Sequence, residues 1–557
     1  MFCQNCGHNV PDNAVFCDSC GGRIEHSAQQ TAPAQQAAFQ PNGAAVKQKP
    51  RKGRAVLILV IVLAVVAIGA AAALILFLPK GGAGSGAPSS LIVSDVAVYN
   101  GKVIEDSEDI NYLYTASLSG DCFVTNNGQF VIKDGKMYEA KMGGSLGFGF
   151  SVAACGNAIA YYTDDFGVEL LDTNTGEITE IEEDGNFQGV TISPDGKTVL
   201  YSDAKTVYLY RDGKSEDIMS RDMWLAVVSV ANDGKYIYVA DMLDNYSFYC
   251  LDADGKKLKK IEGSTMSFFT NKDNTQVGFF LRENLQTFVI YDAAENKTYK
   301  YDDVSLNHRT RPLSEYTYDT DYPKLNSQAW SGAMAQVSHY NVDDLTHCLY
   351  FGSKTIYETD GKSIDAIAEN TTAMKTLPDG GVIYLKSGEE LKNYPGTLII
   401  RYSDGEKEEI ADDVYGFGVS DSGNSIYYFA EDEKLFLYRN GKSTEIADDV
   451  CVQNYANGLD YVGVGVPTIL NEDVIVYPGN DEQWYIYKNG KTETLGEDVS
   501  VYNRLTASSV YGTEQEIRYT SFNQNSVLFL NDTYLLYKED GDPFIIDASG
   551  SIKPLED

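Results

Sequence analysis

Two hydrophobic patterns divide this chain. Residues 55–78, AVLILVIVLAVVAIGAAAALILFL, form an unbroken apolar run of 24 residues without a charge, an amide side chain or a proline. From Leu91 to the C-terminus, in contrast, Val, Ile, Tyr and Phe alternate with polar residues over short runs that Gly-containing turns interrupt. The first pattern predicts one long apolar helix. The second predicts β-strands, because alternation with a period of two places apolar side chains on one face of a strand.

The apolar run 55–78 predicts a transmembrane helix. At about 1.5 Å per residue it extends roughly 36 Å, enough to cross a hydrocarbon core of about 30 Å. A cleaved signal peptide is the weaker alternative, because its apolar core is shorter and lies nearer the N-terminus. Five basic residues lie between positions 47 and 54, whereas the C-terminal flank offers only Lys80. The positive-inside rule therefore predicts a single-pass protein of the cell membrane, with a cytoplasmic N-terminus and an extracytoplasmic C-terminal domain.

Composition predicts a flexible linker on each side of this helix. Residues 25–54 are rich in Gln, Ala and Pro and end in the basic cluster, and residues 79–90 are rich in Gly and Ser. Such compositions lack the aliphatic side chains needed for a core. The expected domains are residues 1–24, 25–54, 55–78, 79–90 and 91–557.

The N-terminal 24 residues carry the strongest chemical signal. Cys3, Cys6, Cys17 and Cys20 have the spacing C-x2-C-x10-C-x2-C. Two CxxC turns supply four thiolates to one tetrahedral zinc ion, and so short a segment needs a metal to fold. A redox dithiol is the weaker alternative, because the predicted cytoplasmic location is reducing. We therefore predict a zinc ribbon.

The segment CQNCGHNVPDNAVFCDSCGGRI resembles the N-terminal zinc ribbon of bacterial membrane proteins, in which a four-cysteine ribbon precedes a linker and a transmembrane helix. The resemblance implies a small interaction module with a protein partner. Nucleic-acid binding is disfavoured, because Arg23 is the only basic residue in the ribbon.

Turns in the C-terminal region recur at a nearly constant spacing. Segments such as VYLYRDGKSEDI near 207 combine an alternating strand, an Asp-Gly or Asn-Gly turn and a charged return strand. These dipeptides supply the positive φ angles of tight hairpins. The turn glycines Gly135, Gly176, Gly213 and Gly255 are 41, 37 and 42 residues apart. A strand-only repeat of about 40 residues predicts an all-β fold with a β-propeller.

A second class of turns, such as TISPDGKTVLY at 191 and SVANDGKYIYV at 229, lies 17 to 24 residues before the first class. Two hairpins per repeat make a four-stranded blade. The SPDGK and NDGK turns resemble those of TolB-like and WD-repeat-like propellers, which implies the fold and not the function. Ten hairpin units can be counted, more than the roughly four to eight blades of most propellers. We expect one ring of seven or eight blades, with more blades, or two rings separated by residues 302–340, as alternatives.

Charge narrows the choice of partners. After position 54 the chain contains 77 acidic and 38 basic residues. This excess disfavours nucleic acid and anionic polymers as ligands and favours cationic partners, although it also serves to keep a large domain soluble.

Candidate catalytic groups are sparse in the region 91–557. His308, His339 and His347 are its only histidines and are too loosely spaced to predict a metal site. Residues 143–147 match G-x-S-x-G, but a nucleophile elbow needs a strand-to-helix turn. Five cysteines in apolar runs are predicted to be buried thiols rather than disulfides; they are Cys122, Cys155, Cys250, Cys348 and Cys451.

Acidic pairs are numerous, as expected from the composition. The repeated sequence EIADDV, at 409–414 and 445–450, predicts equivalent strand ends in two blades.

Two functions of different classes fit these observations. The first is a non-catalytic protein in which the ribbon binds a cytoplasmic protein and the propeller binds a protein, peptide or glycan outside. The second is a cell-surface hydrolase or lyase with carboxylates in the propeller funnel. The first is preferred, because no acid, base and nucleophile can be assembled from motifs.

Overall fold

The computed structural model describes residues between 91 and 555, with gaps, all within one unit of the chain, Gly86–Asp557. The longest gaps are 143–149, 184–188, 314–335, 387–395, 451–467, 503–509, 512–517 and 520–526. The predicted ribbon, linkers and apolar helix lie outside the described residues. Within the described ranges, no helix is both long and apolar enough to cross a membrane.

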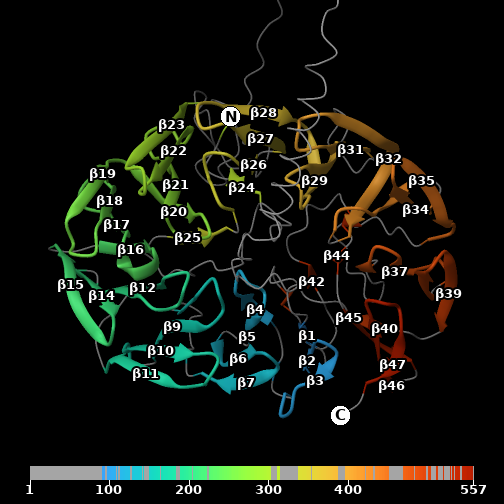
Figure 1. The fold of residues 1–557 in the computed structure, drawn as a ribbon, viewed down its shortest axis with the longest axis horizontal. Coiled ribbons are helices and arrows are strands. Elements are labelled where there is room, and N and C mark those ends of the chain that lie inside the picture. The colour runs from blue at the N-terminus through green and yellow to red at the C-terminus, as the bar shows by residue number, and fades with distance from the viewer. Residues whose placement is uncertain are drawn as a thin grey trace, which may run out of the picture. The chain divides into compact units, whose positions relative to one another are not determined.

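The described chain is built from four-stranded antiparallel sheets whose strands pair in chain order, and these sheets follow one another along the sequence (Figure 1). We number them sheet 1 to sheet 10. Within a sheet, the first turn joins strands one and two, and the second turn joins strands two and three.

Sheets 1 to 5 have these strands: β4 (Leu113–Ala116), β5 (Cys122–Thr125), β6 (Phe130–Lys133) and β7 (Lys136–Glu139); β8 (Phe150–Val152), β9 (Ala158–Tyr162), β10 (Val168–Asp172) and β11 (Ile178–Glu182); β12 (Gly189–Ile192), β13 (Val199–Ser202), β14 (Thr206–Arg211) and β15 (Lys214–Ser220); β16 (Leu225–Val230), β17 (Ile237–Asp241), β18 (Ser247–Leu251) and β19 (Lys257–Ile261); β20 (Ser264–Thr270), β21 (Gln276–Leu281), β22 (Thr287–Asp292) and β23 (Lys297–Asp302).

Sheets 6 to 10 have these strands: β24 (Arg311–Pro312), β26 (Leu349–Gly352), β27 (Thr355–Thr359) and β28 (Ile364–Ala368); β29 (Thr371–Thr376), β30 (Val382–Lys386), β31 (Gly396–Arg401) and the first part of β32 (Lys407–Val419); the second part of β32, β33 (Ile426–Ala430), β34 (Lys434–Arg439) and β35 (Lys442–Ala447); β36 (Thr468–Asn471), β37 (Val474–Pro478), β38 (Trp484–Lys488) and β39 (Lys491–Gly496); β40 (Ser500–Tyr502), β45 (Tyr534–Glu539), β46 (Asp542–Asp547) and β47 (Ile552–Pro554).

The remaining described elements are short: β1 (Leu91–Val93), β2 (Ala97–Tyr99) and β3 (Lys102–Val103) form a three-stranded sheet; β41 (Val510–Tyr511) pairs with β42 (Arg518–Tyr519); β25 (Gln336–His339), β43 (Val527–Leu528) and β44 (Leu530–Asn531) are added strands; and η2 (Asn232–Gly234) is a 3₁₀ turn.

Hairpins close where the sequence predicts them. In sheet 3, Arg211 pairs with Lys214 across a two-residue turn in which Asp212 and Gly213 have φ angles of 51° and 75°. Asn440 and Gly441 do the same in sheet 8, with φ of 52° and 73°. Both residues at positive φ define the mirror-image turn that matches the twist of paired strands. The Asp-Gly and Asn-Gly predictions are confirmed at these positions.

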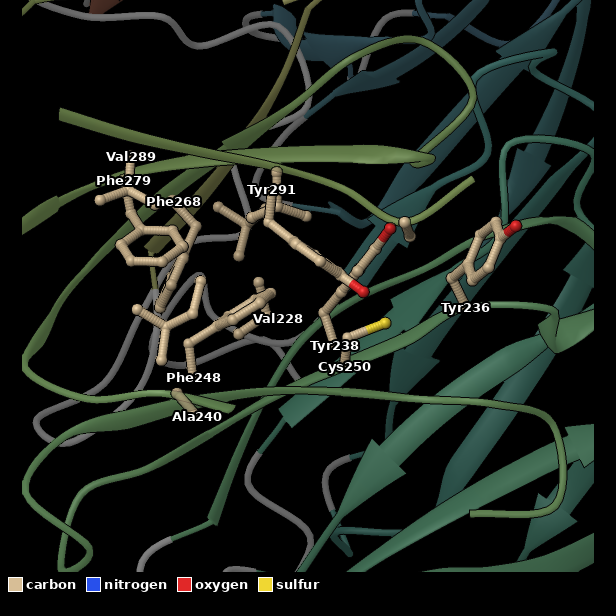
Figure 2. Close-up of a cluster of buried hydrophobic side chains, with 14 of the residues drawn as sticks. Val228, Tyr236, Tyr238, Ala240, Phe248, Cys250, Phe268, Phe279, Val289 and Tyr291 are labelled. Carbon is tan, nitrogen blue, oxygen red and sulfur yellow. The ribbon is translucent and has the colours of Figure 1, made fainter. Parts of the chain in front are cut away.

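Aromatic side chains pack between neighbouring sheets. Phe248 of sheet 4 is fully buried, with its ring centroid 5.9 Å from that of Phe268 and 5.0 Å from that of Phe279, both in sheet 5. Figure 2 shows these rings with Tyr238 and Tyr291 in one cluster. Each fully buried aromatic side chain contributes about 2–3 kcal/mol. The apolar face of each strand therefore holds adjacent sheets together.

The described residues contain ten four-stranded units, more than the seven or eight preferred from the sequence. Six are separate sheets, two carry an added strand, and two belong to one larger sheet, in which β32 closes sheet 7 and opens sheet 8. The lower expected number came from the usual size of propellers. The count of ten hairpin units in the sequence is the better guide.

The repeated EIADDV segments occupy equivalent places. Asp413 and Asp449 have φ angles of 56° and 55°, and the following Val414 and Val450 are both fully buried. In each copy, the Glu and the Ala pair with the third strand, so both copies lie at the end of the fourth-strand pairing and the prediction of equivalent strand ends is confirmed. In the first copy, however, the strand continues through the motif into the next sheet.

The polar segment 302–340 does not simply interrupt the repeat. Its residues 311–312 form the first strand of sheet 6, and residues 336–339 form β25, which pairs in parallel with the first strand of sheet 5. In the same way, β43 and β44 pair in parallel with β32 and β36. First strands of three sheets thus receive an added parallel strand.

Candidate binding face

The cysteines predicted to bind zinc, Cys3, Cys6, Cys17 and Cys20, lie outside the described residues, as do residues 143–147 and His308. The donor set itself fits a structural zinc ion, because four thiolates complete a tetrahedral shell and leave no open position. In the part of the chain that the structure describes, no group of three or more His, Cys, Asp or Glu side chains is arranged to hold a metal ion.

His339 is tied into the first turn of sheet 5. Its Nδ1 lies 2.7 Å from Thr270 Oγ1 and 3.0 Å from Asn274 Oδ1. The amide nitrogen of Asn274 donates to the Val230 carbonyl at 2.9 Å, which leaves the amide oxygen facing the imidazole. Nδ1 is therefore the protonated nitrogen, and burial lowers the pKa of His339 to about 4. The neutral imidazole therefore holds Asn274, whose amide joins sheet 5 to sheet 4.

His347 has a separate, exposed environment. Its Nδ1 lies 2.8 Å from Asp344 Oδ2. Asp344 also accepts hydrogen bonds from Thr346 and Gln276, and together these bonds lower its pKa to about 2 against the opposing effect of burial. The two histidines thus bind different partners.

The cysteines are only partly as predicted. Cys122 and Cys250 are buried, and burial raises the pKa of each thiol to about 12. Cys348 is partly buried, and Cys155 is exposed, with its thiol 2.8 Å from Asn157 Oδ1. The expectation of burial is therefore wrong for Cys155. The apolar run before it ends at Ala154, and Cys155 itself lies in a first turn. All four are free thiols, and Cys451 lies outside the described residues.

The first turns of sheets 1 to 4 form a continuous line of hydrogen bonds between sheets. The backbone N–H of Ser119 donates to the Ala154 carbonyl of the next sheet, Cys155 N–H to the Pro194 carbonyl, and Asp195 N–H to Asn232 Oδ1. Within these turns, the side chain of the first residue accepts a backbone N–H: Ser193 Oγ accepts from Thr198 at 3.0 Å. These polar groups of the first turns are therefore already engaged in hydrogen bonds within and between the sheets.

Second turns are different, because they carry exposed apolar side chains. Phe166 in sheet 2, Leu243 in sheet 4 and Leu285 in sheet 5 are 56%, 65% and 39% exposed. Among the described residues, the only other large hydrophobic side chains so exposed are Ile178 and Ile552, which lie on the fourth strands of their sheets. Because first turns of adjacent sheets bond to one another, the second turns lie at the opposite ends of the strands.

The second turns of sheets 4 and 5 are joined directly. Arg282 N–H donates to the Gly263 carbonyl at 2.8 Å, and Gly263 N–H donates to the Asn245 carbonyl at 2.9 Å. The Arg282 guanidinium lies over the Tyr246 ring, 3.4 Å from its centroid. Leu243 and Leu285 therefore lie in the two turns that a stacked Arg–Tyr pair connects. We call these turns, with that of sheet 2, the second-turn face.

Sequence reasoning missed this face. Segments TDDFGV, ADMLDNY and LRENLQT are polar enough to be read as ordinary turns, and one apolar residue in each gives no periodic signal. One signal in the sequence could have pointed to this face: Phe166 and Leu285 occupy turn positions where Gly or Asn is usual.

Comparison with family models matches residues 2–24 to the zinc-ribbon domain. The comparison with curated proteins found no match. The prediction of an N-terminal zinc ribbon is confirmed as a family match over that segment.

Comparison with solved structures returns chains of low similarity. The surface component PorZ of the type-IX secretion system of Porphyromonas gingivalis is 10% identical, with a TM-score of 0.29, covering 74% of this chain and 59% of that one. Dipeptidyl peptidase 4 of the same organism is 12% identical, with a TM-score of 0.34 and coverage of 65% and 63%. The β-propeller domain of Cps50 (Swd1) of Myceliophteria thermophila is 10% identical, with a TM-score of 0.24 and coverage of 62% and 95%.

This chain spans about three fifths of the length of the first two structures. The consecutive four-stranded sheets described above are what makes the fold β-propeller-like.

Proposed function

We propose that this protein is a single-pass membrane protein that links a cytoplasmic zinc ribbon to an extracytoplasmic, non-catalytic binding domain. The apolar segment 55–78 and the basic residues before it support this topology. The ribbon binds one zinc ion through Cys3, Cys6, Cys17 and Cys20 and presents a small surface to a protein partner. When bound, the metal supplies the cross-link that lets so short a segment fold.

One observation carries the binding role of the external domain: the exposed Phe166, Leu243 and Leu285 on turns of nearby sheets. All three lie at the same end of the strands, and Leu243 and Leu285 lie in adjacent sheets, an arrangement that favours an interaction surface. The polar side chains considered as catalytic candidates are engaged otherwise, since His339 bonds to the scaffold and His347 pairs with Asp344. This supports a binding, sensing or scaffold role for the domain.

Cross-linking in intact cells, followed by enrichment and mass spectrometry, tests the proposal. The native protein is compared with the double variant Cys3→Ser, Cys6→Ser, which cannot complete the zinc shell. We expect cytoplasmic partners to be lost and envelope partners to be retained. Turnover of wall glycans or peptides by the purified protein, abolished by changing carboxylates of the propeller, would instead make it an enzyme.

Topology has its own test. A membrane-impermeant thiol reagent should not label a cysteine introduced between residues 25 and 45 in intact cells. It should label one introduced between residues 81 and 90. Labelling of the first site would reverse the proposed orientation.

A further inference from the structure

The second turns use side chains that their backbone disfavours. Eighteen described residues other than glycine have positive φ, and thirteen of them are Asn or Asp, which tolerate this conformation. The other five all lie in second turns: Phe166, Tyr246, Leu285, Lys354 and Glu433. A large L-residue in the left-handed region costs about 1–2 kcal/mol.

Two of these residues are unfavourable in a second respect. Phe166, with φ of 61°, and Leu285, with φ of 55°, are also exposed apolar side chains. Gly or Asn would relieve the backbone strain and expose no apolar surface. Neither local folding nor core packing explains the choice, so an external contact is the remaining physical reason.

Charge defines the kind of contact. Asp165 and Glu283 lie next to Phe166 and close to Leu285 in sequence and are exposed, and Glu262 lies beside the Gly263 link. Asp244 accepts hydrogen bonds from Tyr249 and Lys260, which lower the pKa of its carboxyl group, and Lys260 also pairs with Glu262. Arg282 is exposed on the same turns, so these four carboxylates are matched by two cations and the surface keeps an acidic excess. An apolar surface with an acidic excess matches a ligand that presents apolar and cationic side chains together.

We infer that the second-turn face binds a basic, apolar segment of another protein. This inference rests on the proposed binding role of the external domain and adds the site and the partner chemistry. An anionic bilayer is disfavoured, because the same carboxylates would be repelled by its headgroups. Tyr246 and Arg282, held by stacking, supply a rigid aromatic and hydrogen-bonding centre of the type enriched in interfaces.

A peptide-binding measurement on the full-length protein in phosphatidylcholine nanodiscs tests the inference. The probes are an amphipathic peptide of Leu and Lys and its counterpart of Leu and Glu. We expect the Leu/Lys peptide to bind, and the Leu/Glu peptide to bind at least tenfold more weakly. The double variant Phe166→Asn, Leu285→Asn should weaken Leu/Lys binding about tenfold, while its unfolding midpoint stays the same or rises.

A matched control separates this face from general adhesion. Ile178 is 44% exposed but lies on the fourth strand of sheet 2, so Ile178→Thr should leave peptide affinity unchanged. Equal loss in Ile178→Thr and in the double variant, no binding of the Leu/Lys peptide, or equal binding of both peptides would overturn the inference. Co-flotation with phosphatidylglycerol vesicles that depends on Phe166 and Leu285 would show a membrane contact instead and would also overturn it.

Failure of this inference can be told apart from failure of the proposed function. A photo-cross-linking phenylalanine analogue is placed at Leu243 or at Ile178 in intact cells. Capture of a protein from Leu243 alone, with a basic apolar segment at the cross-linked peptide, supports the inference. Capture from Ile178 alone leaves a binding function but places it on another surface, whereas capture from neither position argues against both proposals.

Discussion

First turns and second turns of the same sheets differ in the side chains that they expose and in the residues that adopt positive φ. In both kinds of turn, polar side chains bond to the backbone: Asn274, in a first turn, donates to Val230 of the neighbouring sheet, and Asn284, in a second turn, accepts from the Thr287 N–H. Among the described turns, only second turns have large apolar side chains, Phe166 and Leu285, that extend into solvent from a strained backbone. The second turns therefore depart from the arrangement that stability alone would favour.

In a repeat fold, the turns that depart from the stable pattern of the other turns are the candidate functional sites. Each repeat supplies both kinds of turn, so the two can be compared within one molecule. Substitution of a turn residue should therefore lower the stability of the protein in a first turn, and should raise it at a strained apolar residue of a second turn. Four predictions use this contrast, from the largest expected effect to the smallest.

Asn274→Ala should be the most damaging turn substitution. It leaves the Val230 carbonyl without its side-chain donor, removes one of the two partners of His339 Nδ1 and places Ala at φ of 53°. We expect a loss of about 3 kcal/mol, because a buried unsatisfied group costs about 1–3 kcal/mol and the left-handed conformation costs Ala about 1–2 kcal/mol. Chemical unfolding measures it. Asn284→Ala, in an exposed second turn, is the control and should cost less than about 1 kcal/mol; equal costs would remove the distinction between the turns.

Acid should weaken the first-turn line through His339. Its pKa is about 4 in the folded protein and about 6.5 when unfolded, so the unfolded state binds more protons between these values. Stability should therefore be constant above about pH 6.5 and fall as the pH drops towards 4, by at most about 3 kcal/mol. The pH dependence of the unfolding midpoint measures this, and His339→Gln should flatten it. An unchanged slope in that variant would assign the acid sensitivity to other groups.

Ser193→Ala should have a moderate effect. Ser193 Oγ accepts the Thr198 N–H at 3.0 Å and donates to Asp195 at 2.7 Å in a buried first turn. Its removal should cost about 1–2 kcal/mol, as for other capping hydroxyls. The thermal unfolding of Ser193→Ala is compared with that of the isosteric Ser193→Cys variant. This comparison separates loss of the hydrogen bond from loss of volume. A change below about 0.3 kcal/mol would show that the turn backbone holds by itself.

Phe166→Asn should act in the opposite direction and be the smallest of the four effects. Asn accepts the positive φ at lower cost, so we expect a gain of about 0.5–1 kcal/mol in stability. Denaturant midpoints of Phe166→Asn and Phe166→Ala isolate the backbone contribution, because only Asn suits this conformation. Destabilisation by Asn would mean that Phe166 stabilises the fold, and the functional interpretation of its strain would fail.

The sequence predicted the hairpins well because their determinants are local. Asp212-Gly213 and Asn440-Gly441 specify their turns without help from the rest of the chain. The zinc ribbon could also be predicted, because the type and spacing of its cysteine ligands are enough to specify a zinc site.

What the sequence could not reveal depends on tertiary placement. The parallel pairing of β25 with β20 joins residues separated by about 70 positions, and parallel pairing has no turn signature. Exposure of Phe166 and Leu285 likewise follows from which end of each sheet they occupy. Cys155 shows the same limit, because an apolar neighbourhood in sequence did not place it in a core.

The long strand β32 has a mechanical consequence. It belongs to two sheets at once, with Lys407 to Val414 paired to β31 and Val414 to Val419 paired to β33. A load applied across the junction of these two sheets meets no slack connector. Under tension, sheets 7 and 8 should therefore yield in one rupture event rather than one after the other.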